Sequence, residues 1–167
     1  MSAEAIVSQE QRVAWIEELR RTPERIAALA ARCPVRDVAR KPASEAFSVR
    51  EIVHHLRDIE IEGHGARLVR LLSETDPDLP GVEGDRLARE RCYNDRPHEA
   101  ALEEFRRSRL GSVARLEGLR PDEWARSGML AGIGPVSVER LVEIWSGHDR
   151  EHLEEMSRLV EPGTALL

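Results

Sequence analysis

Residues 48–72 read SVREIVHHLRDIEIEGHGARLVRLL, and this stretch predicts the fold of the whole chain. It begins with Ser48 and Glu51 at the spacing of a capping box, in which the serine hydroxyl accepts from a backbone N–H and the glutamate reaches back to the serine N–H. Apolar and small residues then recur every three or four positions, as on one face of an α-helix. They are Ile52, Leu56, Ile59, Gly63 and Ala66. The stretch therefore predicts one long amphipathic helix.

Three further stretches show the same helical periodicity, at about residues 8–32, 95–119 and 137–160. The first contains Pro23, which predicts a kink or a restart because proline supplies no backbone N–H. Short helical pieces are predicted at 85–92 and 121–124, and a glycine-punctuated loop at 128–135. No stretch alternates apolar and polar residues long enough to indicate a sheet. These observations predict an all-α four-helix bundle.

Composition agrees with a single helical domain over residues 1–167. Aromatic residues make up only 4% of the chain, so the core must be built from aliphatic side chains, which favours helices. The 25 basic and 31 acidic residues give a net charge of −6, which argues against a general affinity for nucleic acid. No apolar run reaches the length of a membrane span or a signal peptide. Cys33 and Cys92 lie far apart and indicate neither a disulfide framework nor a thiolate zinc site.

The last predicted helix carries two histidines on its apolar face. On a wheel of about 100° per residue, this face contains Leu141, Trp145, Met156 and Leu159. His148 and His152 lie in the middle of the same stripe, and their spacing of four residues lets their rings approach one point. Two imidazoles are therefore directed at the core of the predicted bundle, where each needs partners for its ring nitrogens.

A third histidine lies beside the inner face of residues 48–72. His55 is at the edge of that face, whereas His54 falls on the other side and is predicted to be solvated. His64 and His98 have no comparable placement and are also predicted to lie on the surface. His55 is thus the inward candidate.

Together, His55, His148 and His152 form a three-imidazole set with an open fourth position, which suits a catalytic Zn²⁺ or Ni²⁺ ion. The alternative is that the rings only hydrogen-bond one another and nearby carboxylates. Two other metal patterns fit poorly. The segment H-D-x-x-H at 148–152 lacks the glutamate base of the H-E-x-x-H zincin motif. The E-x-x-H pair of di-iron bundles occurs once, at Glu51 and His54, on the outward side.

Several segments resemble the DinB and YfiT-like superfamily of metal-dependent enzymes. Residues 47–60, FSVREIVHHLRDIE, are similar to the family segment W-S-x-R-E-h-h-x-H-L-x-D-x-E, where h is apolar, with Phe47 in place of the commoner tryptophan. Residues 134–137, GPVS, and 145–153, WSGHDREHL, are similar to the family's last helix with its H-D-x-x-H-L core. The segment FRRSR at 105–109 resembles the third helix, which carries an arginine in this region. The likeness spans roughly residues 12–160.

The resemblance implies an up-down-down-up bundle, often dimeric, with His55, His148 and His152 as ligands of a divalent metal. It also implies an enzyme, because family members include transferases that use low-molecular-weight thiols. One departure is Met129-Leu130, which precedes the glycine loop where relatives often have a histidine.

Arg109 is unusual on physical grounds, because it falls on the inner stripe of its helix and a guanidinium cannot lose its charge there. It must meet an anionic substrate group or a carboxylate, such as Glu60, Glu62 or Asp149. Asp149 directly follows a ligand candidate; it either orients an imidazole or is solvated. We take Arg109 and Asp149 as the candidate catalytic residues.

The leading hypothesis is a metal-dependent thiol transferase or hydrolase that acts on a small molecule, with zinc or nickel lowering the pKa of a bound water or thiol. The alternative is a non-catalytic bundle that binds metal structurally or serves as a dimeric interaction module. We expect a cytoplasmic homodimer that binds neither nucleic acid nor membranes.

Overall fold

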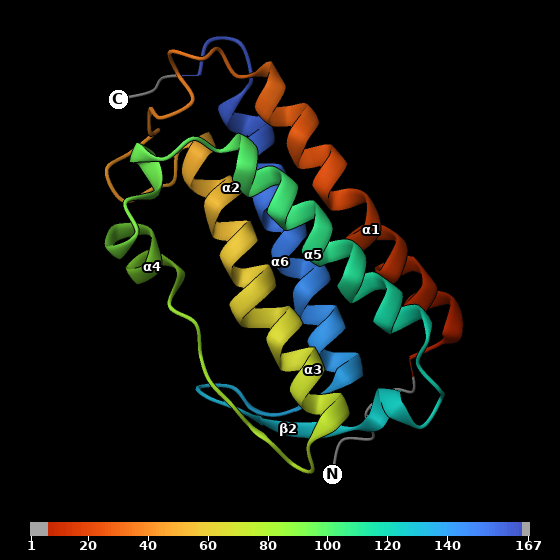
Figure 1. Ribbon diagram of the computed structural model, residues 1–167. Coiled ribbons are helices and arrows are strands. Elements are labelled where there is room, and N and C mark those ends of the chain that lie inside the picture. Colours follow the sequence, from red (N-terminus) through yellow and green to blue (C-terminus); the bar gives the residue numbers. More distant parts are fainter. Residues whose placement is uncertain (1–6, 165–167) are drawn as a thin grey trace.

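The computed structural model describes residues 7–164, whose long helices form an up-down-down-up bundle (Figure 1). α1 (Gln9–Arg32) and α6 (Val138–Leu159) run in one direction, whereas α5 (Glu99–Glu117) and the helical segment at 49–73 run in the other. α1 packs against α5 and α6, and α2 at the start of the 49–73 segment contacts the same two helices. The predicted four-helix bundle is confirmed.

The helical segment at 49–73 contains a π-helical turn that the sequence did not indicate. It consists of α2 (Val49–Asp58), the π-helix η1 (Ile59–His64) and α3 (Gly65–Ser73). A π-turn holds more residues than an α-turn, so every residue after it is rotated away from its place on an ordinary helical wheel. At Gly65 a Cβ atom would lie 2.5 Å from the carbonyl oxygen of Glu60, so this turn requires glycine. The turn changes which side chains face the core.

The predicted starts of α1, α2 and α6 are confirmed. Ser48 Oγ accepts from the N–H of Glu51 at 3.1 Å, and the Glu51 carboxylate accepts from the N–H of Ser48 at 2.9 Å, which completes the capping box. Ser8 and Ser137 cap α1 and α6 through their hydroxyl groups. Pro23 lies inside α1, which continues through it as one helix rather than restarting.

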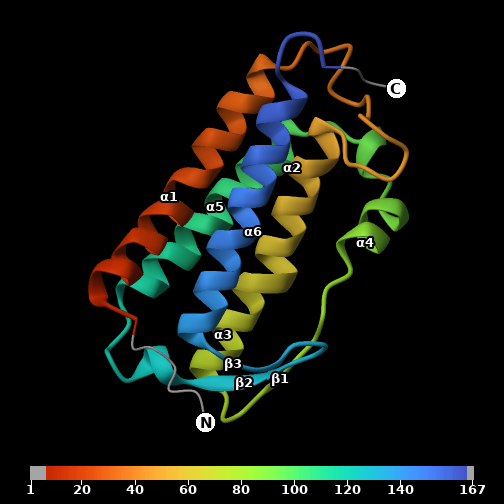
Figure 2. The ribbon, with the colours of Figure 1, turned by 180° about the vertical axis from the view of Figure 1, so that it is seen from behind.

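The prediction that the chain has no sheet was wrong. Residues predicted as a glycine loop belong to a hairpin, in which β2 (Ser127–Leu130) pairs antiparallel with β3 (Gly134–Ser137). β1 (Asp78–Leu79) adds in parallel to β2, giving the order β1-β2-β3. Strands of two to four residues are too short for their alternation to be recognised in a sequence. The sheet closes one end of the bundle (Figure 2).

The connection between α3 and α5 runs beside α2. It includes α4 (Gly84–Glu90) and the 3-10 helix η2 (Tyr93–Asp95), so that α5 begins at Glu99 and not near residue 95 as predicted. The predicted turn near Trp124 is the 3-10 helix η3 (Glu123–Ala125). Figure 2 shows α4 and the chain that precedes it lying along the outer side of the 49–73 segment.

The interior contains two large apolar clusters with a charged layer between them. One cluster includes Trp145 and the other Phe105. The guanidinium carbon of Arg109 lies 4.9 Å from the ring centroid of Phe105 and 5.2 Å from that of Trp145. The core is therefore interrupted at the level of Arg109.

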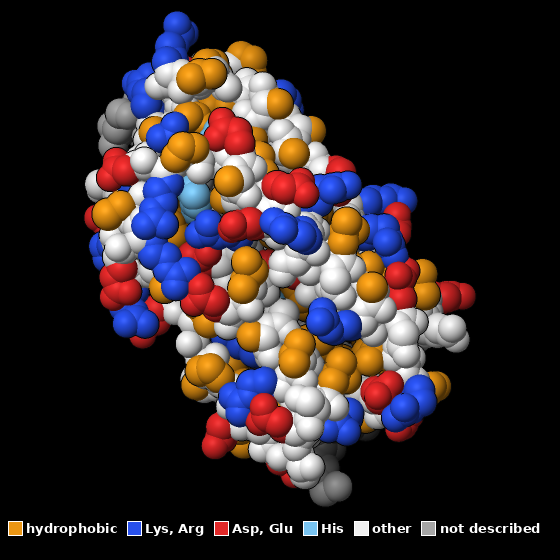
Figure 3. All heavy atoms as spheres, viewed as in Figure 1, with side chains coloured by type: hydrophobic (Ala, Val, Ile, Leu, Met, Phe, Trp, Pro, Cys, Tyr) orange, Lys and Arg blue, Asp and Glu red, His pale blue; other side chains and the backbone are white. Residues whose placement is uncertain are grey.

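The outer surface mixes charges of both signs. Figure 3 shows basic and acidic side chains interspersed over one face, with hydrophobic side chains scattered between them. Within residues 7–164, no helix combines the length and the apolar character needed to cross a membrane.

Candidate metal centre

The structure brings the three predicted histidines together. His55 comes from α2, and His148 and His152 come from successive turns of α6, so the two helices face each other across the cluster. Nε2 of His55 lies 3.0 Å from Nε2 of His148, and one ring nitrogen from each histidine lies within 4.8 Å of the others. Modest side-chain rotations would bring one nitrogen of each ring to about 2.0–2.1 Å from a shared metal position, which is the length of a zinc–imidazole bond.

In His148 and His152, the surroundings of Nδ1 leave Nε2 as the ring nitrogen available to a metal. Nδ1 of His152 lies 3.0 Å from the carboxylate of Glu155 and can donate to it, which leaves Nε2 free to bind a metal. Nδ1 of His148 is buried without a hydrogen bond and lies 4.0 Å from the carboxylate of Asp149. A small rotation of this ring would make that hydrogen bond. A carboxylate beside a ligating imidazole is the usual means of fixing the ring and its tautomer.

Gly84 covers one side of the centre. A Cβ atom at this position would lie 2.6 Å from Nδ1 of His55 and closer still to its Cε1. Glycine at the start of α4 therefore lets the backbone pack directly on the imidazole. His55 is 8% exposed, whereas the side chains of His148 and His152 are 22% and 14% exposed. The cluster is thus reached from the α6 side.

His55 and His148 are held in the neutral form that a metal requires. Burial, and then repulsion from the other two imidazoles, lowers the pKa of His55 to about 2. Burial also lowers the pKa of His148. Neutral imidazoles are the ligands that zinc and nickel bind, so the donor set fits a divalent ion. Three histidines that could hold a divalent metal are therefore present.

Arg109 is buried in the bundle, as its position on the helix predicted, and it meets carboxylates. It is 1% exposed; its Nε donates to Glu60 at 2.7 Å, and its two Nη atoms donate to Asp149 at 2.5 and 3.1 Å. Ser112 Oγ donates to the other oxygen of Glu60 at 2.8 Å. Glu62, the third carboxylate considered, instead binds Arg91. The fork of Arg109 is consequently filled by protein groups.

Pro23 leaves a backbone carbonyl of α1 available to this network, because proline has no N–H to donate. In an uninterrupted helix, the N–H of residue 23 would donate to the carbonyl of Leu19. That carbonyl instead accepts from Nη1 of Arg109 at 2.9 Å. A helix-breaking residue thus frees an acceptor for a buried cation.

The pKa values of the two carboxylates around Arg109 shift in opposite directions. Burial raises the pKa of Glu60, and this effect outweighs the opposing attraction of Arg109. For Asp149, burial acts in the same direction, but the charge of Arg109, the nearby His148 ring and the hydrogen bonds from Arg109 outweigh it and hold the pKa well below its usual range. Asp149 is therefore the firmly ionised partner and lies between Arg109 and His148.

The prediction that His54 and His64 lie on the surface was wrong. His54 is 2% exposed because the segment after α4 covers it: its ring stacks on Tyr93 with centroids 5.4 Å apart. His64 is 4% exposed and stacks on Trp145 at 5.2 Å, with its edge toward His148 at 5.4 Å. The π-turn that ends at His64 rotates this residue inward, which an ordinary wheel does not show. His98 is half-buried rather than exposed.

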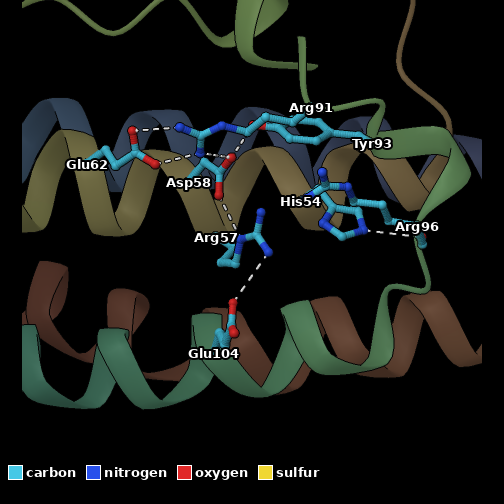
Figure 4. Close-up of polar contacts among 8 residues, drawn as sticks. All are labelled: His54, Arg57, Asp58, Glu62, Arg91, Tyr93, Arg96 and Glu104. Atoms are coloured by element: carbon cyan, nitrogen blue, oxygen red, sulfur yellow. Dashed lines mark hydrogen bonds and ion pairs between the residues drawn. The ribbon is translucent and has the colours of Figure 1, made fainter. Parts of the chain in front are cut away.

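A second polar network holds the segment around α4 against α2 (Figure 4). Asp58, 2% exposed, accepts from Nε of Arg57 at 2.7 Å, from Nη1 of Arg91 at 2.6 Å and from the hydroxyl of Tyr93. Arg91 also binds Glu62 with a shortest distance of 2.5 Å. Sequence reasoning missed this anchor, although the aspartate of the H-L-x-D pattern was its signal. It keeps the segment that carries Gly84 in place over His55.

Comparisons with known proteins agree with this architecture. The sequence profile of the DinB superfamily matches residues 18–156. The structure is similar to one described as "YfiT from Bacillus subtilis is a probable metal-dependent hydrolase with an unusual four-helix bundle topology". That match has a TM-score of 0.86 and 17% sequence identity, and it covers 95% of this chain and 91% of the other. A search of curated proteins found no match. Because the profile covers most of its length, the chain belongs to the DinB superfamily.

Proposed function

We propose that this protein is a metal-dependent enzyme that uses His55, His148 and His152 to hold a zinc or nickel ion and acts on a small molecule. The observation that carries the proposal is the approach of three imidazoles from two helices, with ligand atoms within 4.8 Å of one another. When bound, such an ion supplies Lewis acidity toward an oxygen or sulfur ligand. The probable hydrolase activity stated for the YfiT structure supports hydrolysis as the reaction to test first, with thiol transfer second.

The number of ligands favours catalysis over a structural role. Structural zinc sites are closed by four protein ligands, whereas catalytic sites have three and keep one position for substrate. Among residues 7–164, the group of metal-ligating side chains contains the three histidines and no fourth member. The partial exposure of His148 and His152 gives a substrate access to this position.

The surrounding residues act by positioning. We assign to Asp149 the orientation of the His148 ring, and to Arg109 the placement of Asp149 through its two hydrogen bonds. Arg109 and Asp149 therefore affect the reaction through His148. Removing such a partner of a ligating histidine costs about 10- to 100-fold in metal affinity or activity.

Metal analysis of the tag-free protein, purified without chelators, tests the proposal. We expect about one zinc or nickel per chain in the wild type, a large loss in His152→Ala, and no loss in the control His98→Ala, whose histidine is outside the cluster. Helical circular dichroism verifies that each variant is folded. Ester and amide hydrolysis, with and without a small thiol such as glutathione, is then compared between metal-loaded and metal-free protein. Equal metal content in wild type and His152→Ala would contradict the ligand assignment.

A further inference from the structure

Two arginines are buried within residues 7–164, and only one of them has a counterion. Arg109 is held by two carboxylates. Arg67, which is 9% exposed, donates from Nε and Nη2 to a single acceptor, the backbone carbonyl of Pro80, at 3.3 and 3.0 Å. Burial lowers the pKa of Arg67, and no anion opposes this effect. A buried cation without an anionic partner is costly, so its placement needs an explanation.

One edge of the Arg67 guanidinium is free. Nη1 makes no hydrogen bond to the described part of the chain, and it is not among the fully enclosed polar atoms without a partner, so it keeps contact with solvent. It lies beside Gly63. A Cβ atom there would be 3.8 Å from Nη1, 3.8 Å from Cγ2 of Val82 and 3.4 Å from Cγ2 of Ile59. Because Gly63 has no side chain, no Cβ fills the space beside Nη1, which we call the niche.

This niche lies on the same wall of the bundle as the metal centre. His64 lies three residues before Arg67 on the same helical segment, and its ring faces that of His148 at a centroid distance of 5.4 Å. The chain from residue 80 to residue 84 connects the two places, because Pro80 accepts from Arg67 and Gly84 packs on His55. The two places are therefore separated by no more than the reach of this five-residue stretch.

We propose that Arg67 binds an anionic group of the substrate, a carboxylate or a phosphate ester, through its free Nη1 edge and so selects negatively charged substrates for the metal centre. The selection of substrates rests on the proposed function, whereas the anion site itself consists of residues outside the metal cluster. A guanidinium is suited to this task because its planar set of donors matches both anions. Arg109 cannot perform it, since its donors are already used by Glu60 and Asp149.

Calorimetric titration of metal-free protein with malonate and with inorganic phosphate tests this site. Two variants remove it in different ways. Arg67→Gln removes the guanidinium, and Gly63→Ala fills the niche while keeping Arg67; the added methyl makes only ordinary contacts, and alanine is a better helix former than glycine. Arg126→Gln is the matched control, because Arg126 also donates to backbone carbonyls, those of Leu71 and Glu74. Thermal unfolding shows that each variant is folded.

We expect saturable binding of at least one anion to the wild type, about tenfold weaker binding in both Arg67→Gln and Gly63→Ala, and unchanged binding in the control. Binding of malonate alone identifies a carboxylate site, and binding of phosphate alone a phosphate site. Absence of binding at millimolar anion, or equal binding in all four proteins, overturns the proposal. Zinc and nickel contents are measured on the same proteins before the metal is removed for the titration. A normal metal content with no anion binding refutes the role of Arg67 alone, whereas absence of both metals refutes the proposed function and leaves the anion titration to stand on its own.

Discussion

Replacing Arg109 by methionine should destabilise the protein strongly, although it removes a polar group from an apolar core. The substitution leaves Glu60 and Asp149 buried without their cation and the carbonyl of Leu19 without a donor. Breaking a buried ion pair by removing one partner costs about 3–5 kcal/mol. For a chain of this size, each kcal/mol lowers the melting temperature by about 2–4 °C, so we expect a decrease of roughly 6–20 °C.

The assay is thermal and urea unfolding followed by circular dichroism at 222 nm. Two further variants separate loss of the cation from loss of packing. Arg109→Lys keeps the charge but lacks the planar fork that reaches both carboxylates, so its stability should lie between those of Arg109→Met and the wild type. The triple variant Arg109→Met, Glu60→Gln, Asp149→Asn removes the uncompensated charges, so it should recover more than half of the loss.

Two results would refute this reasoning. If Arg109→Met lost less than about 1 kcal/mol, Arg109 would not be the counterion of the charged layer. If the triple variant were no more stable than the single one, the loss would come from packing against Phe105 and Trp145, which Arg109 also contacts, and not from stranded carboxylates.

Three further predictions concern Gly84 beside the metal centre, the N-terminus of α2 and the imidazole cluster. Gly84→Ala should lower zinc affinity measured by competition with a chromogenic chelator, because its methyl would overlap the His55 ring, whereas Gly81→Ala, with open space around it, should not. Ser48→Ala should lower the free energy of unfolding by about 1 kcal/mol in urea titrations through loss of the capping box, and an unchanged urea midpoint would contradict this. The pKa of His55 is about 2 in the folded chain and 6.5 in the unfolded reference, so the unfolded state binds more protons between these two pH values. The metal-free protein should therefore lose stability as the pH falls below 6.5, by up to about 1.4 kcal/mol per pH unit for this group. Constant stability between pH 6.5 and 4.5 would contradict this.

Helix periodicity and capping chemistry, which are local in sequence, were sufficient to predict the bundle. The start of α2 depends on two side chains three residues apart, and the spacing of His148 and His152 places both rings on one face whatever packs against them. The inward position of Arg109 could likewise be predicted, because its place on the stripe of α5 depends only on the helix that contains it. That the three histidines bind a metal stays a prediction.

Tertiary structure alone decided the features that depend on segments far apart or on a departure from the regular helix. The π-turn at 59–64 rotates His64 toward Trp145 and His148, and no pattern of 3.6 residues per turn can reveal it. His54 is buried because Tyr93, 39 residues away, lies on it, and His55 is covered because Gly84 allows a close backbone approach. The choice of Glu60 and Asp149 over Glu62 as partners of Arg109 required three helices to be placed together. Periodicity within one helix determines which way a side chain points, but only packing between helices determines what it meets.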